Sequence, residues 1–213
     1  MKNWVKKWGR KGLKLISLFF VAQIKNLCYN VPMKSFFAFI LEIVKIVVLA
    51  LVIVVPIRFF LFQPFFVRGQ SMKPNFENGD YLIIDEISYR FRQPRRGEVV
   101  VFKYPGNPSQ RYIKRIIGLP GEAVKIKEGR VMIFNEQGEQ VLNESDYLSP
   151  SISTPGEVQI SLAENEYFVL GDNRFSSADS RRWGPLPKEN IIGRVFLRAW
   201  PFAVLAKFEA PIY

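Results

Sequence analysis

The longest apolar run in the chain is FFAFILEIVKIVVLALVIVVPI, at residues 36–57. As an α-helix this run would be about 33 Å long, enough to cross the hydrocarbon core of a bilayer. Glu42 and Lys45 are its only charged residues, and they lie near its N-terminal end, where they can pair or reach the headgroups. The pattern predicts a single transmembrane helix at 35–60. A buried core helix of a soluble protein is the alternative, and the length and the basic flank argue against it.

The segments on either side of this run indicate its orientation. Residues 1–34 mix lysine and arginine with short apolar runs, which predicts a basic cytoplasmic or interfacial segment. A cleaved signal peptide is the alternative, but no small-x-small site follows Ala22. Because basic residues favour the cytoplasmic side, the chain after Arg58 is expected outside. An aromatic belt is predicted there from Phe59, Phe60, Phe62, Phe65 and Phe66.

Short β-rich runs, separated by glycine and proline, fill the rest of the chain. The runs predicted as strands are 81–84, 98–102, 124–127, 130–134, 166–170 and 194–197. Glu128-Gly129 predicts a hairpin turn, and the polar stretch 143–157 is predicted as a surface loop. No long helix is predicted after the apolar run. The predicted fold class is therefore mostly β, with one extracytoplasmic β-rich domain at 61–213.

Charge and residue types narrow the chemistry. The net charge is +11, and much of it lies beside the apolar run, which favours a lipid bilayer over nucleic acid as the partner. The chain has no His, which excludes a Ser-His-Asp triad, a Cys-His dyad and a His-ligated zinc site. Its single Cys28 excludes intrachain disulfides and Cys-rich metal clusters. A hydrolase of this composition needs a lysine, a carboxylate or an oxygen-ligated metal as its base.

Two short motifs contain a nucleophile and a base. In Gly69-Gln70-Ser71-Met72-Lys73-Pro74 a serine lies between a flexible glycine and a turn-fixing proline, a pattern that ordinary loops share. Lys114 lies in a strand-like run and, on strict alternation, shares a face with Tyr112 and Ile116. An apolar face would lower the pKa of this lysine and allow it to act as a base. A solvent-facing lysine is the alternative.

A third motif is GDNRFSSADSRRWG at 171–184, dense in turn formers and charges, as a functional loop would be. Ca²⁺ binding through Asp172, Asn173 and Asp179 is the alternative. The spacing is not that of an EF-hand, and the interleaved arginines would repel a cation. We therefore expect no metal and no other cofactor.

Together the motifs resemble those of the type I signal peptidases, bacterial membrane proteases that remove signal peptides from exported preproteins. The match covers roughly residues 36–200, in order, spacing and position after the apolar run. Besides 69–74 and 171–184 it includes 79–83, 96–102 and Tyr112-Ile113-Lys114-Arg115 running into Gly118-Leu119-Pro120-Gly121. The resemblance implies a signal-peptidase-like antiparallel β catalytic domain behind one N-terminal transmembrane helix.

The resemblance also assigns roles to individual residues. Ser71 would be the nucleophile and Lys114 the general base of a Ser-Lys dyad that forms an acyl-enzyme. Ser177 would orient the lysine nitrogen, while Asp179 and Arg181 would brace the loop. Some relatives carry, at the position of Gly69, a serine that donates to the oxyanion. The second donor here is therefore a backbone N–H or an ordered water.

The implied substrates are secretory preproteins, cut after a small-x-small motif at the outer face of the plasma membrane, with the protein export machinery as a further partner. Wall positions for the residue at the cut are Val67, Met72, Phe76, Tyr112 and Ile113. Those for the residue two positions back are Phe65, Leu82 and Val101. The short stretch 122–165 predicts an accessory domain reduced to one hairpin and its loop.

Three other functions remain as alternatives. A LexA-like self-cleaving regulator shares the Ser-Lys chemistry, but it needs a DNA-binding helical domain in place of the apolar span. A catalytically silent, membrane-tethered β module is disfavoured by the presence of Ser71, Lys114 and Ser177. A basic nucleic-acid-binding protein is disfavoured because the excess charge clusters beside the apolar run.

Overall fold

The computed structural model describes residues 36–56, 62–201 and 206–207. Contacts divide the chain into two compact units, Met1–Ile53 and Val54–Tyr213. The predicted basic segment at 1–34 lies outside the described residues, as do Arg58, Phe59 and Phe60 of the predicted interface. We therefore describe one helix and one β unit, each by itself.

The apolar run forms helix α2, Phe36–Pro56, where the sequence predicts a helix. Its apolar side chains are largely exposed, with Leu41 at 60% and Val52 at 64%. Among the residues that the structure describes, no helix is long and apolar enough to cross a membrane.

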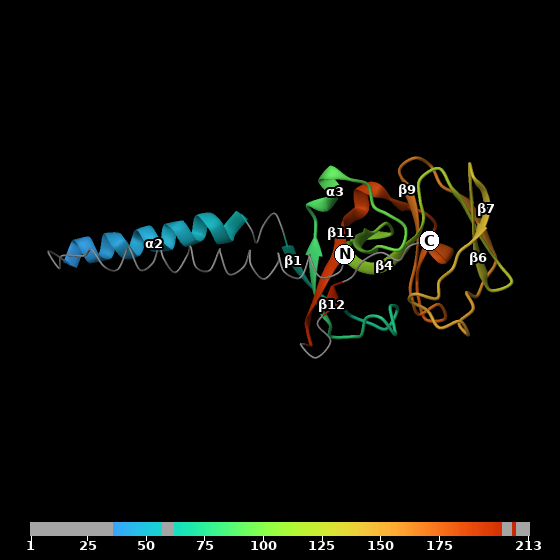
Figure 1. Ribbon diagram of the computed structural model, residues 1–213, viewed down its shortest axis with the longest axis horizontal. Coiled ribbons are helices and arrows are strands. Elements are labelled where there is room, and N and C mark those ends of the chain that lie inside the picture. The colour runs from blue at the N-terminus through green and yellow to red at the C-terminus, as the bar shows by residue number, and fades with distance from the viewer. Residues whose placement is uncertain (1–35, 57–61, 202–205, 208–213) are drawn as a thin grey trace, which may run out of the picture. The chain divides into compact units, whose positions relative to one another are not determined.

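The second unit is built on an eight-stranded antiparallel sheet in the order β1-β2-β11-β3-β4-β9-β10, with β12 paired to β11 (Figure 1). Its strands are β1 Phe62–Phe66, β2 Tyr81–Asp85, β3 Val99–Tyr104, β4 Asn107–Gly118, β9 Glu166–Leu170, β10 Leu186–Pro187, β11 Ile191–Trp200 and β12 Ala206–Lys207. Among the described residues, the connections between strands include the short helical turns α3 (Ser88–Phe91) and α4 (Ser180–Trp183) and the 3-10 turn η2 (Lys188–Asn190). The mostly β fold class is thus confirmed for this unit.

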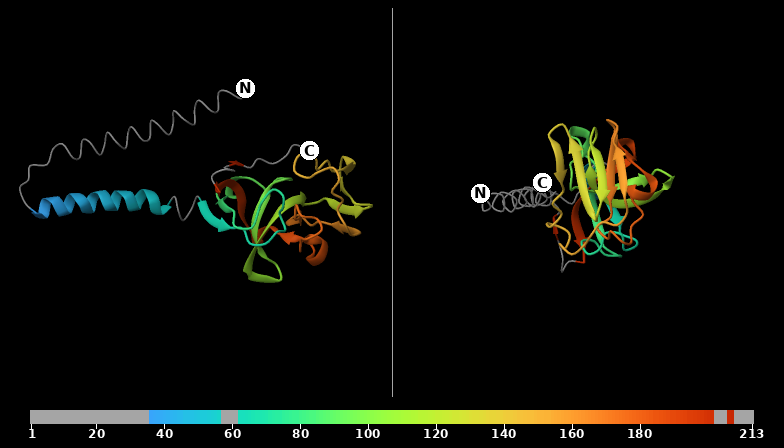
Figure 2. Two further views of the ribbon diagram at one scale, coloured as in Figure 1. Left: turned by 90° about the horizontal axis from the view of Figure 1, so that it is seen from below. Right: turned by 90° about the vertical axis from the view of Figure 1, so that its right-hand side faces the viewer.

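A second, four-stranded sheet follows the order β7-β6-β5-β8 and lies at the far end of the β unit from β1 (Figures 1 and 2). Its strands are β5 Ala123–Lys127, β6 Arg130–Asn135, β7 Gly138–Val141 and β8 Val158–Ser161. The predicted hairpin forms between β5 and β6, with Glu128 and Gly129 at φ of 52° and 76°, as a type I′ turn requires. The accessory domain is nevertheless larger than the predicted hairpin and loop, because β7 and β8 extend the hairpin to a four-stranded sheet.

Three hydrophobic clusters meet at β4, the strand that carries the candidate base. Ile113 packs in the cluster of β1, β2 and β3, while Ile116 packs with Phe102 and other residues of β3 and β9. Ile117 packs in the cluster that joins the two sheets. Because β4 is covered on both faces, alternation along it does not separate buried from exposed side chains.

Residues 62–66 form edge strand β1, which tolerates Pro64 because an edge needs fewer backbone donors. Their place in an aromatic belt stays a prediction. One prediction is only partly correct. The stretch 143–157 has no strand, as predicted, but it is not all at the surface. Tyr147, Leu148 and Thr154 are buried in it. Their burial brings this loop against the candidate site.

Candidate active site

Ser71 lies in a tight turn between β1 and β2. The turn is closed by hydrogen bonds from Lys73 N to Gln70 O (3.2 Å) and from Phe76 N to Met72 O (2.9 Å). Met72 and Phe76 are 1% and 0% exposed in the core, so they anchor the turn while Ser71 stays half-buried. The apolar residues of the motif therefore fix where the hydroxyl is presented.

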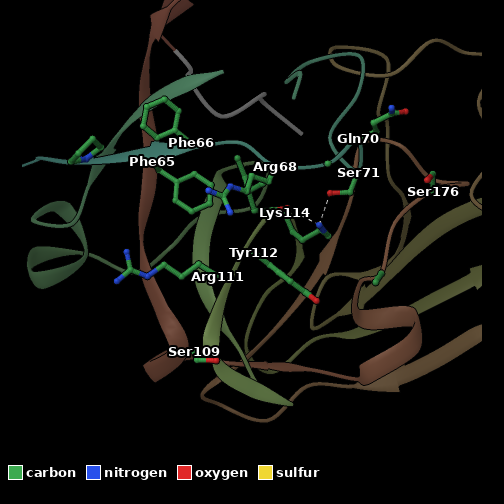
Figure 3. Close-up of a pocket in the computed structure, with 14 residues that line it drawn as sticks. Phe65, Phe66, Arg68, Gln70, Ser71, Ser109, Arg111, Tyr112, Lys114 and Ser176 are labelled. Carbon is green, nitrogen blue, oxygen red and sulfur yellow. Dashed lines mark hydrogen bonds between the residues drawn. The ribbon is translucent and has the colours of Figure 1, made fainter. Parts of the chain in front are cut away.

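Lys114 reaches the same point from β4. It is only 3% exposed, and its Nζ lies 2.8 Å from Ser71 Oγ, so the two side chains point toward one another (Figure 3). Nζ also donates to Ile113 O at 2.8 Å and lies 5.6 Å from the centre of the Tyr112 ring. The structure thus brings the predicted nucleophile and the predicted base into direct contact.

The surroundings of Lys114 favour its neutral form. Burial lowers the pKa of the ammonium group to about 8, from 10.5, and the negative charges of Asp179 and Asp172 oppose that shift. The effect of burial on the pKa is larger than that of the two carboxylates, because no acid forms an ion pair with this lysine among the described residues. A substantial fraction of Lys114 is therefore neutral near physiological pH and can accept the Ser71 proton.

The loop at 171–184 holds the Ser71 turn in place through Asn173 and Asn75. Asn173 donates from its backbone N to Ser71 O (3.0 Å) and from its side chain to Gln70 O (3.1 Å). Asn75 Nδ2 donates to Asp172 Oδ2 at 2.8 Å. These hydrogen bonds tie the Ser71 turn to the loop at 171–184.

A buried ion pair ties this loop to β4. Arg115 Nε and Nη2 donate to the two carboxylate oxygens of Asp172 at 2.8 and 2.7 Å, and the arginine stacks 4.0 Å above the Tyr147 ring. Both side chains are nearly inaccessible, at 7% and 0%. Because Arg115 follows Lys114 directly, this pair fixes the strand at the candidate base. We did not predict its role from the sequence, although both residues lie in the matched motifs.

A second buried ion pair links the loop to the 143–157 stretch. Arg174, with a fully buried side chain, donates to Glu144 at 2.5 and 2.8 Å and also to Thr154 and Gly171 O. The sequence places Arg174 in the third motif without a role of its own, and Glu144 lies in a stretch predicted to be a plain surface loop. No periodic pattern or motif in the sequence connects the two.

Asp179 and Arg181, whose predicted role is to brace the loop, pair with one another. The Asp179 carboxylate accepts hydrogen bonds from Arg181 Nε and Nη2, each at 2.8 Å, and from Gly171 N at 3.1 Å. Burial raises the pKa of Asp179, but the hydrogen bonds and charge of Arg181 lower it by more, so the net shift is downward and the group is ionised. Arg181 also donates to Pro155 O and Arg174 O, which closes the loop on itself.

The positions of Ser177 and Gly69 give less support to their predicted roles. The buried Ser177 Oγ makes no hydrogen bond to Lys114 among the described residues, and it lies near enough to Asp179 to help lower the pKa of that carboxyl group. Gly69, at φ 95°, donates its N–H to Asn78 Oδ1 at 2.9 Å. That N–H is therefore occupied and is not the second oxyanion donor. The orienting role of Ser177 stays a prediction.

Ser71 and Lys114 line a cleft of about 530 Å³. Of the predicted substrate-wall residues, Phe65, Tyr112 and Ile113 line this cleft. Figure 3 shows the first two beside Lys114. The others are buried in one core cluster, and these are Val67, Met72, Phe76, Leu82 and Val101. Their contact with substrate stays a prediction. The cleft presents a serine hydroxyl and a lysine amine of lowered pKa at one point, which is the arrangement for acyl transfer by serine and lysine.

Comparison with known proteins identifies relatives that are similar to most of this chain. The family model described as "Signal peptidase, peptidase S26" matches residues 40–200. "Probable signal peptidase I-2" of Synechocystis sp. is 39% identical, with 76% of this chain and 73% of the relative covered. "Signal peptidase I" of Leptolyngbya laminosa is 39% identical, with 81% and 85% covered.

A solved structure of a signal peptidase I from Enterococcus faecalis V583 is 30% identical, with a TM-score of 0.41 over 49% of this chain and 97% of that one. The family model spans most of the chain and contains both Ser71 and Lys114. The chain therefore belongs to the signal peptidase family, peptidase S26.

Proposed function

We propose that this chain is a membrane-anchored serine endopeptidase that removes N-terminal signal peptides from exported preproteins. The observation that carries the proposal is the 2.8 Å approach of a buried Lys114 Nζ to Ser71 Oγ inside an open cleft. Family membership and the names of the relatives supply the substrate class. A binding module without activity would have no need to bury a lysine against a serine hydroxyl.

The proposed reaction is acyl transfer through Ser71. Neutral Lys114 takes the hydroxyl proton while Ser71 Oγ attacks the carbonyl of the scissile peptide bond. The resulting ammonium group gives the proton to the leaving amine, and an acyl-enzyme remains. A water molecule, deprotonated by the same lysine, then releases the acyl group and restores Ser71.

The oxyanion of the intermediate is stabilised by donors held in the Ser71 turn. The Ser71 N–H is the first, and its turn is held by the hydrogen bonds from Asn173. A second backbone N–H or an ordered water supplies the other. Asp179 and Arg181 keep the loop rigid, and Ser177 orients the Lys114 amine when substrate enters.

The substrate lies extended in the cleft, with small residues at the cut and two positions before it. Phe65, Tyr112 and Ile113 line the cleft, and the core residues Val67 and Met72 lie in one cluster with Ile113. Because this core is closely packed, little room is left for a large side chain beside Ser71. A small-x-small motif before the cut is the sequence that fits such walls.

The apolar segment at 35–60 anchors the enzyme to the plasma membrane. Support comes from the exposed apolar side chains of α2, a surface that water would not leave uncovered. The basic residues of 1–34 place the N-terminus in the cytoplasm, so the catalytic domain at 61–213 works on the outer face. There it meets preproteins as the export machinery delivers them.

The function is tested by mapping the cut in a preprotein with one Ala-x-Ala motif, incubated with the full-length enzyme in detergent. Mass spectrometry of the product should show one new N-terminus directly after the motif. Replacing the second Ala by Phe should slow cleavage by about a hundredfold, whereas a neutral change at x, such as Asn to Gln, should alter it little. Cleavage at scattered sites, or equal cleavage of the Phe substrate, would rule out the proposed specificity.

A further inference from the structure

Two arginines line the cleft without a hydrogen-bond or ion-pair partner in the part of the chain that the structure describes. Arg68 follows β1 and Arg111 lies on β4, and both are exposed. Among the described residues, no hydrogen bond and no ion pair within 4 Å engages either guanidinium group. Both side chains extend away from Ser71, toward the side of the cleft where Phe65 and Phe66 lie (Figure 3). The cleft therefore carries uncompensated positive charge on one side.

The exposed charges at the rim of the cleft lie next to buried apolar residues. Val67 is 2% exposed, and its neighbour Arg68, on the opposite side of the extended chain, is exposed. On β4, Arg111 lies in the exposed N-terminal part of the strand, whereas Ile113, at 5% exposed, lies where its buried part begins. An extended substrate alternates in the same way, so every second side chain points outward to the rim. If small residues at the cut and two positions before it face the core, the residue between them faces the arginines.

We propose that Arg68 and Arg111 form a cationic rim that selects for Asp or Glu, and against Lys or Arg, at the middle position of the small-x-small motif. The inference rests on the proposed function, since it needs a substrate in the cleft. It adds a charge preference at a position that the small-residue rule leaves free.

Nearby charged groups leave the net charge of this side of the cleft positive. Glu86 is the acid that faces Arg111; burial raises the pKa of Glu86, and the charges of Arg111 and Arg90 lower it, with a net upward shift. Its carboxylate is not within ion-pair distance of either rim arginine. Protonated Lys114 would add a further positive charge on the floor of the cleft. One half-buried acid therefore does not cancel the two exposed arginines.

The expected preference is modest and depends on salt. Exposed charge pairs are weak, so kcat/KM for an Asp peptide should exceed that for the matching Lys peptide by about threefold to tenfold at low ionic strength. Screening shortens the range of these charges from about 10 Å at 0.1 M salt to about 3 Å at 1 M. The preference should therefore shrink toward one in 1 M salt.

The test compares three peptides, with Ala-Asp-Ala, Ala-Asn-Ala or Ala-Lys-Ala before the cut, in neutral detergent with the full-length enzyme. The readout is the ratio of kcat/KM for the Asp peptide to that for the Lys peptide. This ratio should fall to about one in the double variant Arg68→Gln/Arg111→Gln, and Arg111→Glu should move it toward the Lys peptide. Arg130→Gln is the control, because it removes the same charge from an exposed position on β6 and should leave the ratio unchanged.

Each other outcome has a defined meaning. A wild-type ratio near one, or an unchanged ratio in the double variant, overturns the rim while leaving the protease intact. Failure of wild type to cut even the Asn peptide overturns the proposed function itself. If the double variant keeps the ratio but binds phosphatidylglycerol vesicles more weakly than Arg130→Gln does, the arginines contact lipid headgroups and the substrate proposal is wrong.

Discussion

Ser71→Ala and Lys114→Arg should each lower kcat/KM for preprotein cleavage by about a thousandfold or more, and the double variant should be no slower than the worse single one. Ser71 supplies the nucleophile and Lys114 the base for the same proton transfer across 2.8 Å. Loss of either side chain abolishes this proton transfer, so loss of the second side chain should lower kcat/KM no further. Non-additivity of this kind is the signature of residues that act as a unit.

Lys114→Arg is the more informative single variant because arginine keeps the positive charge and stays protonated in proteins. Lys125→Arg, on β5 in the other sheet, is the matched control and should cleave at the wild-type rate. Initial rates on one preprotein, with folding checked by circular dichroism, decide the outcome. Retention of more than a tenth of the activity by Lys114→Arg would show that another group takes the proton.

Gly171→Ala should cost about a hundredfold in kcat/KM while the protein stays folded. A Cβ at Gly171 would lie 2.5 Å from Ser71 O and 2.2 Å from Ser177 Oγ, both closer than such contacts can be. The Ser177 side chain can rotate, but the Ser71 carbonyl belongs to the backbone. The Ser71 turn must therefore shift, and with it the distance from Ser71 Oγ to Lys114 Nζ.

Gly118→Ala is the matched control for this prediction. Its Cβ would meet Val124 Cγ2 at 2.4 Å and Leu162 Cδ1 at 2.8 Å, side chains of the core between the two sheets. This overpacking should lower the free energy of unfolding by about 1–3 kcal/mol without altering kcat/KM in the folded protein. Thermal melts and rates measured on both variants separate the two effects. Equal loss of activity in both, in step with stability, would mean that Gly171 acts only through folding.

The sequence was most informative about the residues that carry the chemistry. Two motifs made Ser71 and Lys114 candidates, and the resemblance, which fits the absence of His, assigned their roles. The structure brings the two side chains within 2.8 Å of one another. The burial of Lys114 was predicted for an incomplete reason, one apolar face. It is buried because three hydrophobic clusters surround β4 on both sides, which depends on strands far away in the chain.

What the sequence did not predict depends on long-range pairing. All four residues of β7 are exposed. No alternation of apolar and polar residues therefore identifies β7 as a strand of the second sheet. Glu144 and Arg174 are 30 positions apart and belong to segments with no shared pattern. Ser177 has a role only by resemblance, and among the described residues its hydroxyl makes no hydrogen bond to Lys114. Local patterns identify a reactive side chain more readily than they identify its distant partner.

The pH dependence of kcat/KM tests most directly the central claim that neutral Lys114 activates Ser71. Burial lowers the pKa of Lys114 to about 8, so below that pH the neutral fraction rises about tenfold per pH unit, and above it the fraction levels off. Initial rates with one neutral peptide should therefore climb from mildly acid conditions and reach a plateau above pH of about 8. A rate that stays flat from mildly acid to alkaline pH, in a protein that remains folded throughout, would contradict the account.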